Sequence, residues 1–187
     1  MDGVTLPTTS PLVEHLLTHS VRRGRFTLKS GKESDWFIDA KQTTCRPDGM
    51  LLVADAALAV LPDDVTAIGG LTMGADAVAF GIAAVAATRG RSLRSFSVRK
   101  EVKGHGAGGR IAGALEAGDR VVIVEDAVTR GVSMLEAADV VEEAGATVVL
   151  LMPVVDRGGT VAALAAERGY PLTPLVTALD LGFAYEG

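Results

Sequence analysis

Two adjacent carboxylates, Glu125 and Asp126, come directly after four β-branched residues at positions 121–124. A turn with a threonine, a glycine and a serine follows at positions 129–133, and then a helix-forming run. Carboxylates accept hydrogen bonds from sugar hydroxyls, and N–H groups at a helix N-terminus bind phosphate. This order predicts a sugar-phosphate site, whereas a strand-end acid beside an ordinary helix cap is the plainer alternative.

Neighbouring residues of a strand point to opposite faces of the sheet. If Glu125 and Asp126 bind one ligand, we therefore expect the chain to be turning already where they lie.

A second candidate segment, residues 99–110, is rich in glycine and in cationic or titratable side chains, among them Arg99, Lys100, Lys103 and His105. Arginine and lysine supply charge for a polyanion, and histidine can hold a proton near neutral pH. A solvated basic loop and a nucleic-acid patch are the alternatives, although no aromatic residue is interleaved for base stacking. Its place between two predicted strands favours a functional loop.

Two further turns follow predicted strands. Residues 69–74 form a glycine-bracketed turn that includes Thr72 and Met73, and its amides could face an anion. The turn matches neither the P-loop nor the dinucleotide fingerprint, and a purely structural role is as good a reading. Arg157 follows Asp156, either as half of a surface ion pair or as a fork for a planar carboxylate. No grouping of Cys and His suggests a structural zinc site.

Composition limits the class of protein. The 187 residues suit a single domain, residues 1–187, with 48% hydrophobic but only 4% aromatic residues. A formal net charge of -5 argues against a general nucleic-acid binder. One cysteine suits a reducing compartment, and neither a signal peptide nor a membrane span is recognisable, so we expect a cytoplasmic protein without a membrane partner.

The elements that must position these residues alternate along the chain. Ser10 and Pro11 predict the start of a first helix, whose apolar face runs to Val21. Short strands are predicted at 26–28 and 36–40, 65–69, 93–98, 121–124, 147–155 and 175–179, and further helices at 47–61, 74–88, 132–144 and 158–168. Such alternation predicts an α/β fold with a mostly parallel central sheet flanked by helices. Ligands then bind beyond the carboxyl ends of the strands, where all four turns lie.

These residues together resemble the type I phosphoribosyltransferases, and closely the orotate-using family. The acidic run resembles the signature for phosphoribosyl pyrophosphate (PRPP), and residues 99–106 resemble the mobile catalytic loop of the orotate enzymes. Residues 26–34 with 36–39 resemble their N-terminal hairpin. The resemblance spans residues 26–180. It implies the type I fold with a small hood built from about residues 1–45.

The resemblance also implies roles for individual residues. Glu125 and Asp126 hold the ribose hydroxyls of PRPP, and the 5′-phosphate lies in the turn beside them. The implied PRPP-binding residues are Lys29, Thr72, Met73, Arg99, Lys100, Lys103, His105, Glu125, Asp126, Ala127, Val128, Thr129, Arg130, Gly131, Val132 and Ser133. The implied orotate-binding residues are Phe37, Ile38, Thr129 and Arg157, and the implied catalytic ones are Lys103, Arg99, His105 and Asp126.

The implied reaction is Mg²⁺-dependent transfer of the phosphoribosyl group from PRPP to N1 of orotate. Mg²⁺ is held mainly by PRPP rather than by protein side chains. The protein is expected to be a homodimer, with the loop 99–110 acting across the interface. Transfer to another base, or a non-catalytic PRPP-sensing regulator on the same fold, are the alternatives.

The chain departs from the family pattern in three respects. Glu125 replaces an aspartate, and Arg130 and Val132 stand where small and hydroxyl residues are usual. Many relatives have a Tyr-Lys pair where this chain has Thr72 and Met73, so a lysine contact to pyrophosphate is missing. Some relatives have a cis peptide in this turn, which we expect here between Leu71 and Thr72.

Overall fold

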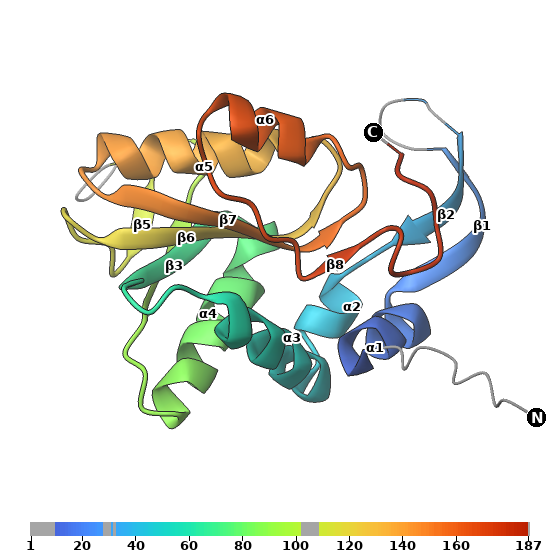
Figure 1. Cartoon of the computed structure of the whole chain (residues 1–187), viewed down its shortest axis with the longest axis horizontal. Helices are drawn as coiled ribbons and strands as arrows, with labels where there is room; N and C mark the ends of the chain where they lie inside the picture. Colours follow the sequence, from blue (N-terminus) through green and yellow to red (C-terminus); the bar gives the residue numbers. More distant parts are fainter. Residues whose placement is uncertain (1–9, 28–30, 32, 102–108, 187) are drawn as a thin grey trace, which may run out of the picture.

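A central sheet organises the molecule (Figure 1). The computed structural model describes residues 10–27, 31, 33–101 and 109–186, and within these the sheet has six strands in the order β5-β4-β3-β6-β7-β8. Their bounds are β3 Ala67–Leu71, β4 Arg94–Val98, β5 Ile111–Gly113, β6 Arg120–Val128, β7 Thr147–Asp156 and β8 Val176–Thr177. All neighbours pair in parallel except β4 and β5. The predicted α/β class with a mostly parallel sheet is confirmed.

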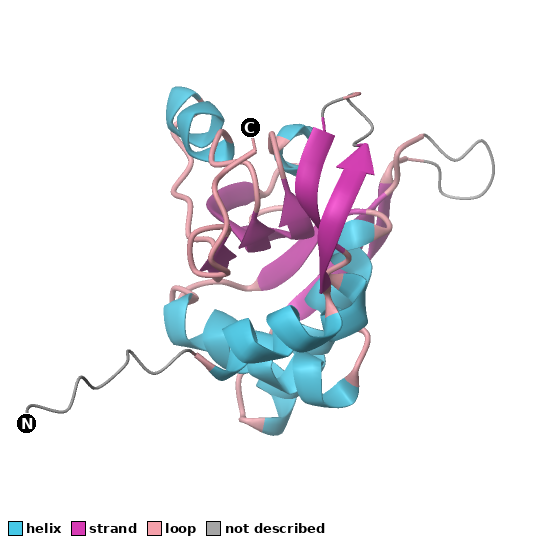
Figure 2. Cartoon of the chain, turned by 90° about the vertical axis from the view of Figure 1, so that its right-hand side faces the viewer, coloured by secondary structure: helices cyan, strands magenta, loops and turns pink. Residues whose placement is uncertain are grey.

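Helices cover both faces of this sheet (Figures 1 and 2). On one face, α1 (Pro11–His19), α3 (Pro47–Val60) and α4 (Gly74–Thr88) share a hydrophobic cluster with Val122 and Val124. On the other, α5 (Val132–Glu143) and α6 (Val161–Glu167) pack with Val121 and Ile123. Successive β6 residues thus bury opposite faces, which explains the uninterrupted β-branched run.

The N-terminal elements form the hood. Strands β1 (Val21–Thr27) and β2 (Glu33–Ile38) pair antiparallel, and the short helix α2 (Lys41–Thr44) follows them. Trp36 of β2 is buried and its ring stacks on Phe183 at 4.3 Å between centroids. Trp36 also belongs to the same hydrophobic cluster as α3 and α4, so the hood packs on the main core.

Several predicted boundaries need correction. Val21 was assigned to the first helix but opens β1, because the helix ends at His19. The helix predicted from Gly158 begins at Val161, since Asp156 Oδ1 accepts the N–H groups of Gly158 and Gly159 and holds them in a turn. The predicted strand 175–179 shrinks to β8, and α2 and β5 were not anticipated. At Gly158 and Gly159 a local side-chain contact thus overrides the helical pattern.

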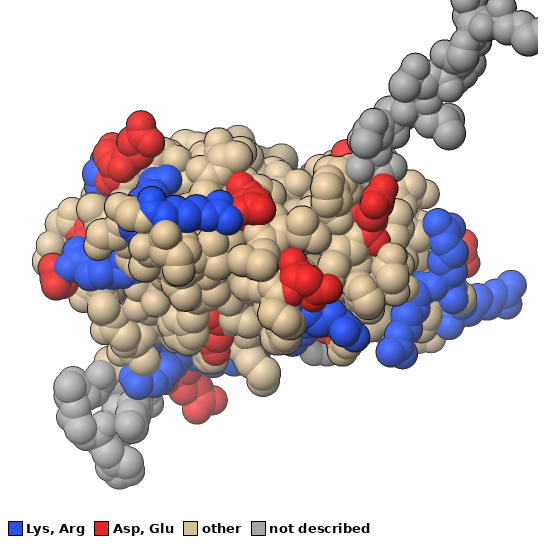
Figure 3. Space-filling model, turned by 90° about the horizontal axis from the view of Figure 1, so that it is seen from below, with Lys and Arg blue, Asp and Glu red and all other residues tan. Residues whose placement is uncertain are grey.

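The surface mixes charges of both signs. In the view of Figure 3, cationic and anionic side chains are interspersed, with a cationic group projecting at the end where Figure 1 places β1. The arginines of β1, Arg22, Arg23 and Arg25, are exposed. Within the described part of the chain, no helix is long and apolar enough to cross a membrane.

Candidate active site

The acid pair lies inside β6. Glu125 and Asp126 are buried, with exposed fractions of 8% and 7%, and the strand continues to Val128. The expectation that the chain turns at the pair is therefore wrong. Both carboxylates nevertheless face one place: a Cβ added at Gly74 would lie 2.8 Å from Asp126 Oδ1 and closer still to Glu125 Oε1. A glycine at the start of α4 thus lets this helix approach both acids.

Burial and mutual repulsion alter the ionisation of the pair. Desolvation and the neighbouring Asp126 raise the pKa of Glu125 to about 8, while the charge of Lys41 opposes that rise. Lys41, at the start of α2, forms an ion pair with Asp126. One proton is therefore held at the acid pair near neutral pH. A ligand bearing hydroxyls or cations would reduce the repulsion between the two carboxylates.

Stability should report this ionisation. The folded-state pKa of Glu125 lies above its ordinary value of 4.5, so between about pH 4.5 and 8 the folded state holds a proton that the unfolded chain has released. The free energy of unfolding should therefore fall as pH rises through that window. We expect Glu125→Gln to remove this fall. Between pH 5 and pH 8.5 the unmodified protein should lose on the order of 2–4 kcal/mol of unfolding free energy that the variant keeps.

Urea unfolding at pH 5 and pH 8.5 measures that difference. The matched control is Glu167→Gln, at an exposed position of α6. If Glu125→Gln and the control show the same change in stability between the two pH values, the buried proton is not at Glu125.

The turn after β6 forms a small cavity of about 200 Å³, lined by Glu125 and by Ala127, Val128, Thr129, Arg130, Gly131, Val132 and Ser133. Gly131 adopts φ 79°, and a Cβ there would also lie 2.5 Å from Val161 Cγ2. It caps α5 without a side-chain hydrogen bond to the first turn. The Met134 N–H of the first turn donates to the Gly131 carbonyl at 3.1 Å, and binding of an anion by the N–H groups ahead of it stays a prediction.

The turn after β3 lies against the acid pair. The Thr72 N–H donates to the Val98 carbonyl at 2.8 Å, which extends the β3–β4 ladder by one peptide. The cis peptide falls one bond later than expected, between Thr72 and Met73, so the prediction of Leu71–Thr72 is wrong. The Thr72 hydroxyl donates to Asp76 at 2.8 Å, and the side chain of Met73 is 72% exposed.

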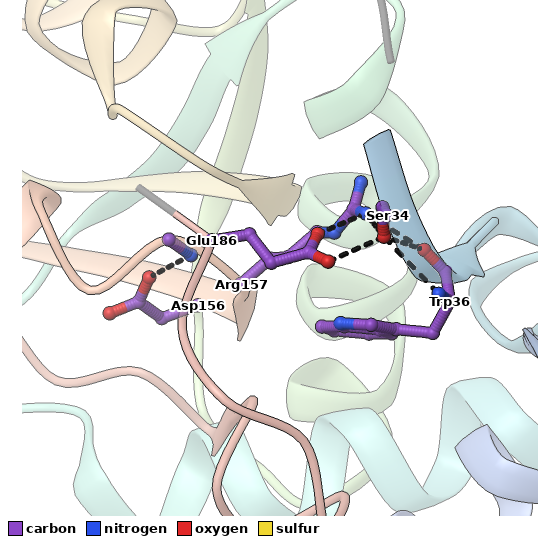
Figure 4. Close-up of polar contacts among 6 residues, drawn as sticks. Ser34, Trp36, Asp156, Arg157 and Glu186 are labelled. Atoms are coloured by element: carbon purple, nitrogen blue, oxygen red, sulfur yellow. Dashed lines mark hydrogen bonds and ion pairs between the residues drawn. The ribbon is translucent and has the colours of Figure 1, made fainter. Parts of the chain in front are cut away.

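Arg157 is held in a polar cluster between the sheet and the hood (Figure 4). Its Nη2 donates to the Trp36 carbonyl at 2.9 Å, to Ser34 Oγ at 3.1 Å and to the carboxylate of Glu186. Ser34 also donates to Glu186, and the guanidinium lies 4.8 Å from the Trp36 ring centroid. Arg157 Nε is buried without a partner within the described residues. The guanidinium of Arg157 is thus buried, and one of its nitrogens already binds a carboxylate, that of Glu186.

Two of the other predicted orotate-binding residues lie on β2. Phe37 is on the exposed face of the hairpin, where its ring lies 5.7 Å from that of Phe26. Ile38 is buried in the hydrophobic core. A contact of either residue with a base stays a prediction.

The ends of the basic loop are described, but Lys103 and His105 lie outside the described residues, as does Lys29. The Arg99 N–H donates to the Arg110 carbonyl at 2.6 Å, and Arg110 Nε donates to the Arg99 carbonyl at 2.8 Å. Arg110 also pairs with Glu136 of α5, and Lys100 is exposed. These contacts close the base of the loop beside the carboxyl end of β4.

Sequence reasoning did not find three residues of this region: Lys41, Ser34 as an Arg157 partner, and Glu186. Each is distant in sequence from its partner, so no local spacing indicates the contact. Locally, the backbone N–H of Lys41 donates to Asp39 Oδ1 at 3.3 Å, and this contact does not indicate the pairing with Asp126.

The arrangement defines the class of protein. A parallel sheet carrying an acid pair, an anion turn and a hood is the type I phosphoribosyltransferase fold, and a phosphoribosyltransferase structure from Corynebacterium diphtheriae matches 95% of this chain and all of that one at TM-score 0.81 and 34% identity. No protein-family model matches the chain.

Sequence relatives narrow the class. Orotate phosphoribosyltransferase of Rhodopirellula baltica is 36% identical over 180 residues, 92% of this chain and 93% of the relative. That of Streptomyces coelicolor is 43% identical over 147 residues, 78% of this chain and 81% of the relative. The PRPP complex of the Mycobacterium tuberculosis enzyme matches at TM-score 0.78 and 32% identity, over 95% of this chain and all of that one. The chain belongs to the orotate phosphoribosyltransferase family of transferase enzymes, as the sequence resemblance predicted.

Proposed function

We propose that this protein transfers the 5-phosphoribosyl group of PRPP to N1 of orotate, giving orotidine 5′-monophosphate and pyrophosphate in pyrimidine biosynthesis. One observation carries the proposal. The acid pair lies near the end of β6, the turn of residues 129–133 follows directly, and Glu125 and this turn line one cavity. A ribose bearing a 5′-phosphate matches that pairing, because carboxylates accept from hydroxyls while helix N–H groups donate to phosphate.

In this proposal Glu125 and Asp126 accept hydrogen bonds from the ribose hydroxyls. The backbone of residues 127–133 and the hydroxyls of Thr129 and Ser133 hold the 5′-phosphate. Gly131 has a left-handed backbone and lines the cavity together with Arg130 and Val132, which in this proposal contribute through their backbone. The site therefore fixes the sugar from two sides.

Orotate, the acceptor of the phosphoribosyl group, lies toward the hood in this proposal. Arg157 donates to the orotate carboxylate, a planar anion that suits a guanidinium fork. Thr129 lies beside Arg157, since the Arg157 N–H donates to the carbonyl of Val128 at 2.8 Å. Phe37 and Ile38 border the base. An acceptor with a carboxylate next to a ring nitrogen is thus preferred to a purine.

Mg²⁺ fits this donor set. The described residues contain no group of three or more His, Cys, Asp or Glu side chains able to hold a metal, but they place two carboxylates beside the ribose position. Such a site would suit a hard cation that takes most of its oxygens from PRPP and water, and Glu125 and Asp126 are the side chains that would help to hold it. Mg²⁺ would supply positive charge that offsets the charge of the pyrophosphate.

The chain's residues then stabilise a transition state of oxocarbenium character. Glu125 and Asp126 orient the ribose, while Arg99, Lys100, Lys103 and His105 stabilise charge on the departing pyrophosphate. Lys29 contacts the same side of PRPP. We propose a cytoplasmic homodimer in which the loop 99–110 serves the partner's site, with neither nucleic acid nor membrane as a partner.

The direct test mixes the protein with PRPP, Mg²⁺ and orotate and follows the loss of orotate absorbance. Turnover that requires both PRPP and Mg²⁺ is the expected result. Turnover with adenine or guanine but not with orotate would reject the acceptor. PRPP binding without turnover on any base would favour a PRPP-sensing regulator.

A further inference from the structure

Negative charge predominates where the acid pair meets the turn after β3. The acid pair brings two carboxylates against Gly74, and the turn that Gly74 ends offers an amide, a hydroxyl and an apolar side chain, from Gly74, Thr72 and Met73. PRPP itself is a polyanion. Besides Mg²⁺ and the loop 99–110, a cation close to the acid pair would offset repulsion between these carboxylates and the ligand.

Lys41 is positioned to be that cation. It is the first residue of α2, and its ammonium pairs with Asp126 across 85 residues of sequence. The Lys41 side chain is 42% exposed, whereas the Asp126 side chain is 10% exposed. Lys41 is thus bound to a buried carboxylate while part of its own side chain remains accessible to a ligand.

The turn after β3 lies on the other side of the same Asp126 carboxylate. Gly74, which ends this turn and opens α4, packs against both acids, and α2 contacts α4. Lys41, Asp126 and Gly74 therefore form a continuous row from the hood to the turn. An anion bound at the turn would lie near the exposed side of Lys41.

We propose that Lys41 is a PRPP-binding residue: it holds Asp126 in the free protein and donates to an anionic oxygen of the pyrophosphate group in the complex. An ammonium has three N–H donors, so it can keep Asp126 and still bind the ligand. The hydrogen bond and charge of Asp126 raise the pKa of Lys41 although burial lowers it, which keeps the side chain charged. The cation thus comes from the hood rather than from the turn.

The test compares Lys41→Met, Lys41→Arg and a control, Arg46→Met, at an exposed arginine ahead of α3 that makes no side-chain cap contact. Calorimetry with pyrophosphate and saturating Mg²⁺ is the primary measurement. Lys41→Met should weaken pyrophosphate binding about tenfold or more, and Lys41→Arg and the control should stay within about threefold. In turnover, Lys41→Met should raise the KM for PRPP and leave that for orotate within about twofold.

This inference rests on the proposed function, but the two can fail separately. If the unmodified protein binds pyrophosphate yet forms no nucleotide from PRPP and orotate, the proposed reaction fails and the calorimetry still judges Lys41. A folded Lys41→Met protein that binds pyrophosphate as tightly as the unmodified one overturns the inference. An equal rise in both KM values, with unchanged pyrophosphate affinity, shows instead that Lys41 positions the hood.

Discussion

Replacing Arg157 by alanine is expected to raise the KM for orotate about a hundredfold or more while the KM for PRPP changes by less than about threefold. The guanidinium is buried and charged, and one truncation removes both its charge and its fork from the acceptor carboxylate. Arg157→Lys keeps the charge but not the fork, so an intermediate loss is expected. Steady-state kinetics with each substrate varied in turn measures the effect.

A change at Glu186 should affect the KM for orotate in the opposite direction. Its carboxylate accepts from Arg157 and Ser34 at the place where we expect the orotate carboxylate to bind (Figure 4). If orotate displaces Glu186, as the proposed site requires, Glu186→Gln should lower the KM for orotate severalfold, with the KM for PRPP unchanged. If Glu186→Gln raises the KM for orotate, then Glu186 orients Arg157 rather than competing with the acceptor.

Because Arg157 also ties the hood to the sheet, each variant needs a folding control. Thermal unfolding of Arg157→Ala shows whether the hood contacts with Ser34 and Trp36 are required for the fold. Normal orotate kinetics in a folded Arg157→Ala protein would remove Arg157 from the acceptor site.

Replacing Asp126 by asparagine should lower kcat/KM for PRPP about a hundredfold or more. The change exchanges one acceptor oxygen for a donor, which faces a ribose hydroxyl less well, and it leaves the Lys41 ammonium without its carboxylate. The pKa of Glu125 should fall as well, because Asp126 contributes to its rise. Kinetics with PRPP as the varied substrate measures the loss.

The matched control is Asp139→Asn, since Asp139 is also an aspartate in an ion pair but lies half exposed on α5, paired with Arg168. Its kcat/KM should stay within about twofold of the unmodified protein. Equal kinetics for Asp126→Asn and this control would show that Asp126 does not contact the ribose.

Most of the fold could be predicted because its signals are local. The helix from Gly74 to Thr88 was predicted with its observed bounds, and the Ser10 hydroxyl accepts the Val13 N–H as the cap pattern indicated. Five of the six strands of the central sheet were located, but their ends differ, as with β6, which extends through the acids to Val128. Carboxylates interrupt a hydrophobic pattern, whereas backbone pairing with β7 continues past them.

The sequence by itself determined the class of chemistry: an acid pair, an anion turn with an obligate glycine, a basic glycine-rich loop and an arginine, all at strand ends of one sheet. Only the tertiary structure decided how these groups are paired. It directs Glu125 and Asp126 toward Gly74, brings Lys41 to Asp126 and places Glu186 on Arg157. The physical reason is range: strand, cap and turn preferences act over a few residues, whereas the charge and burial of a side chain depend on partners up to 152 residues away.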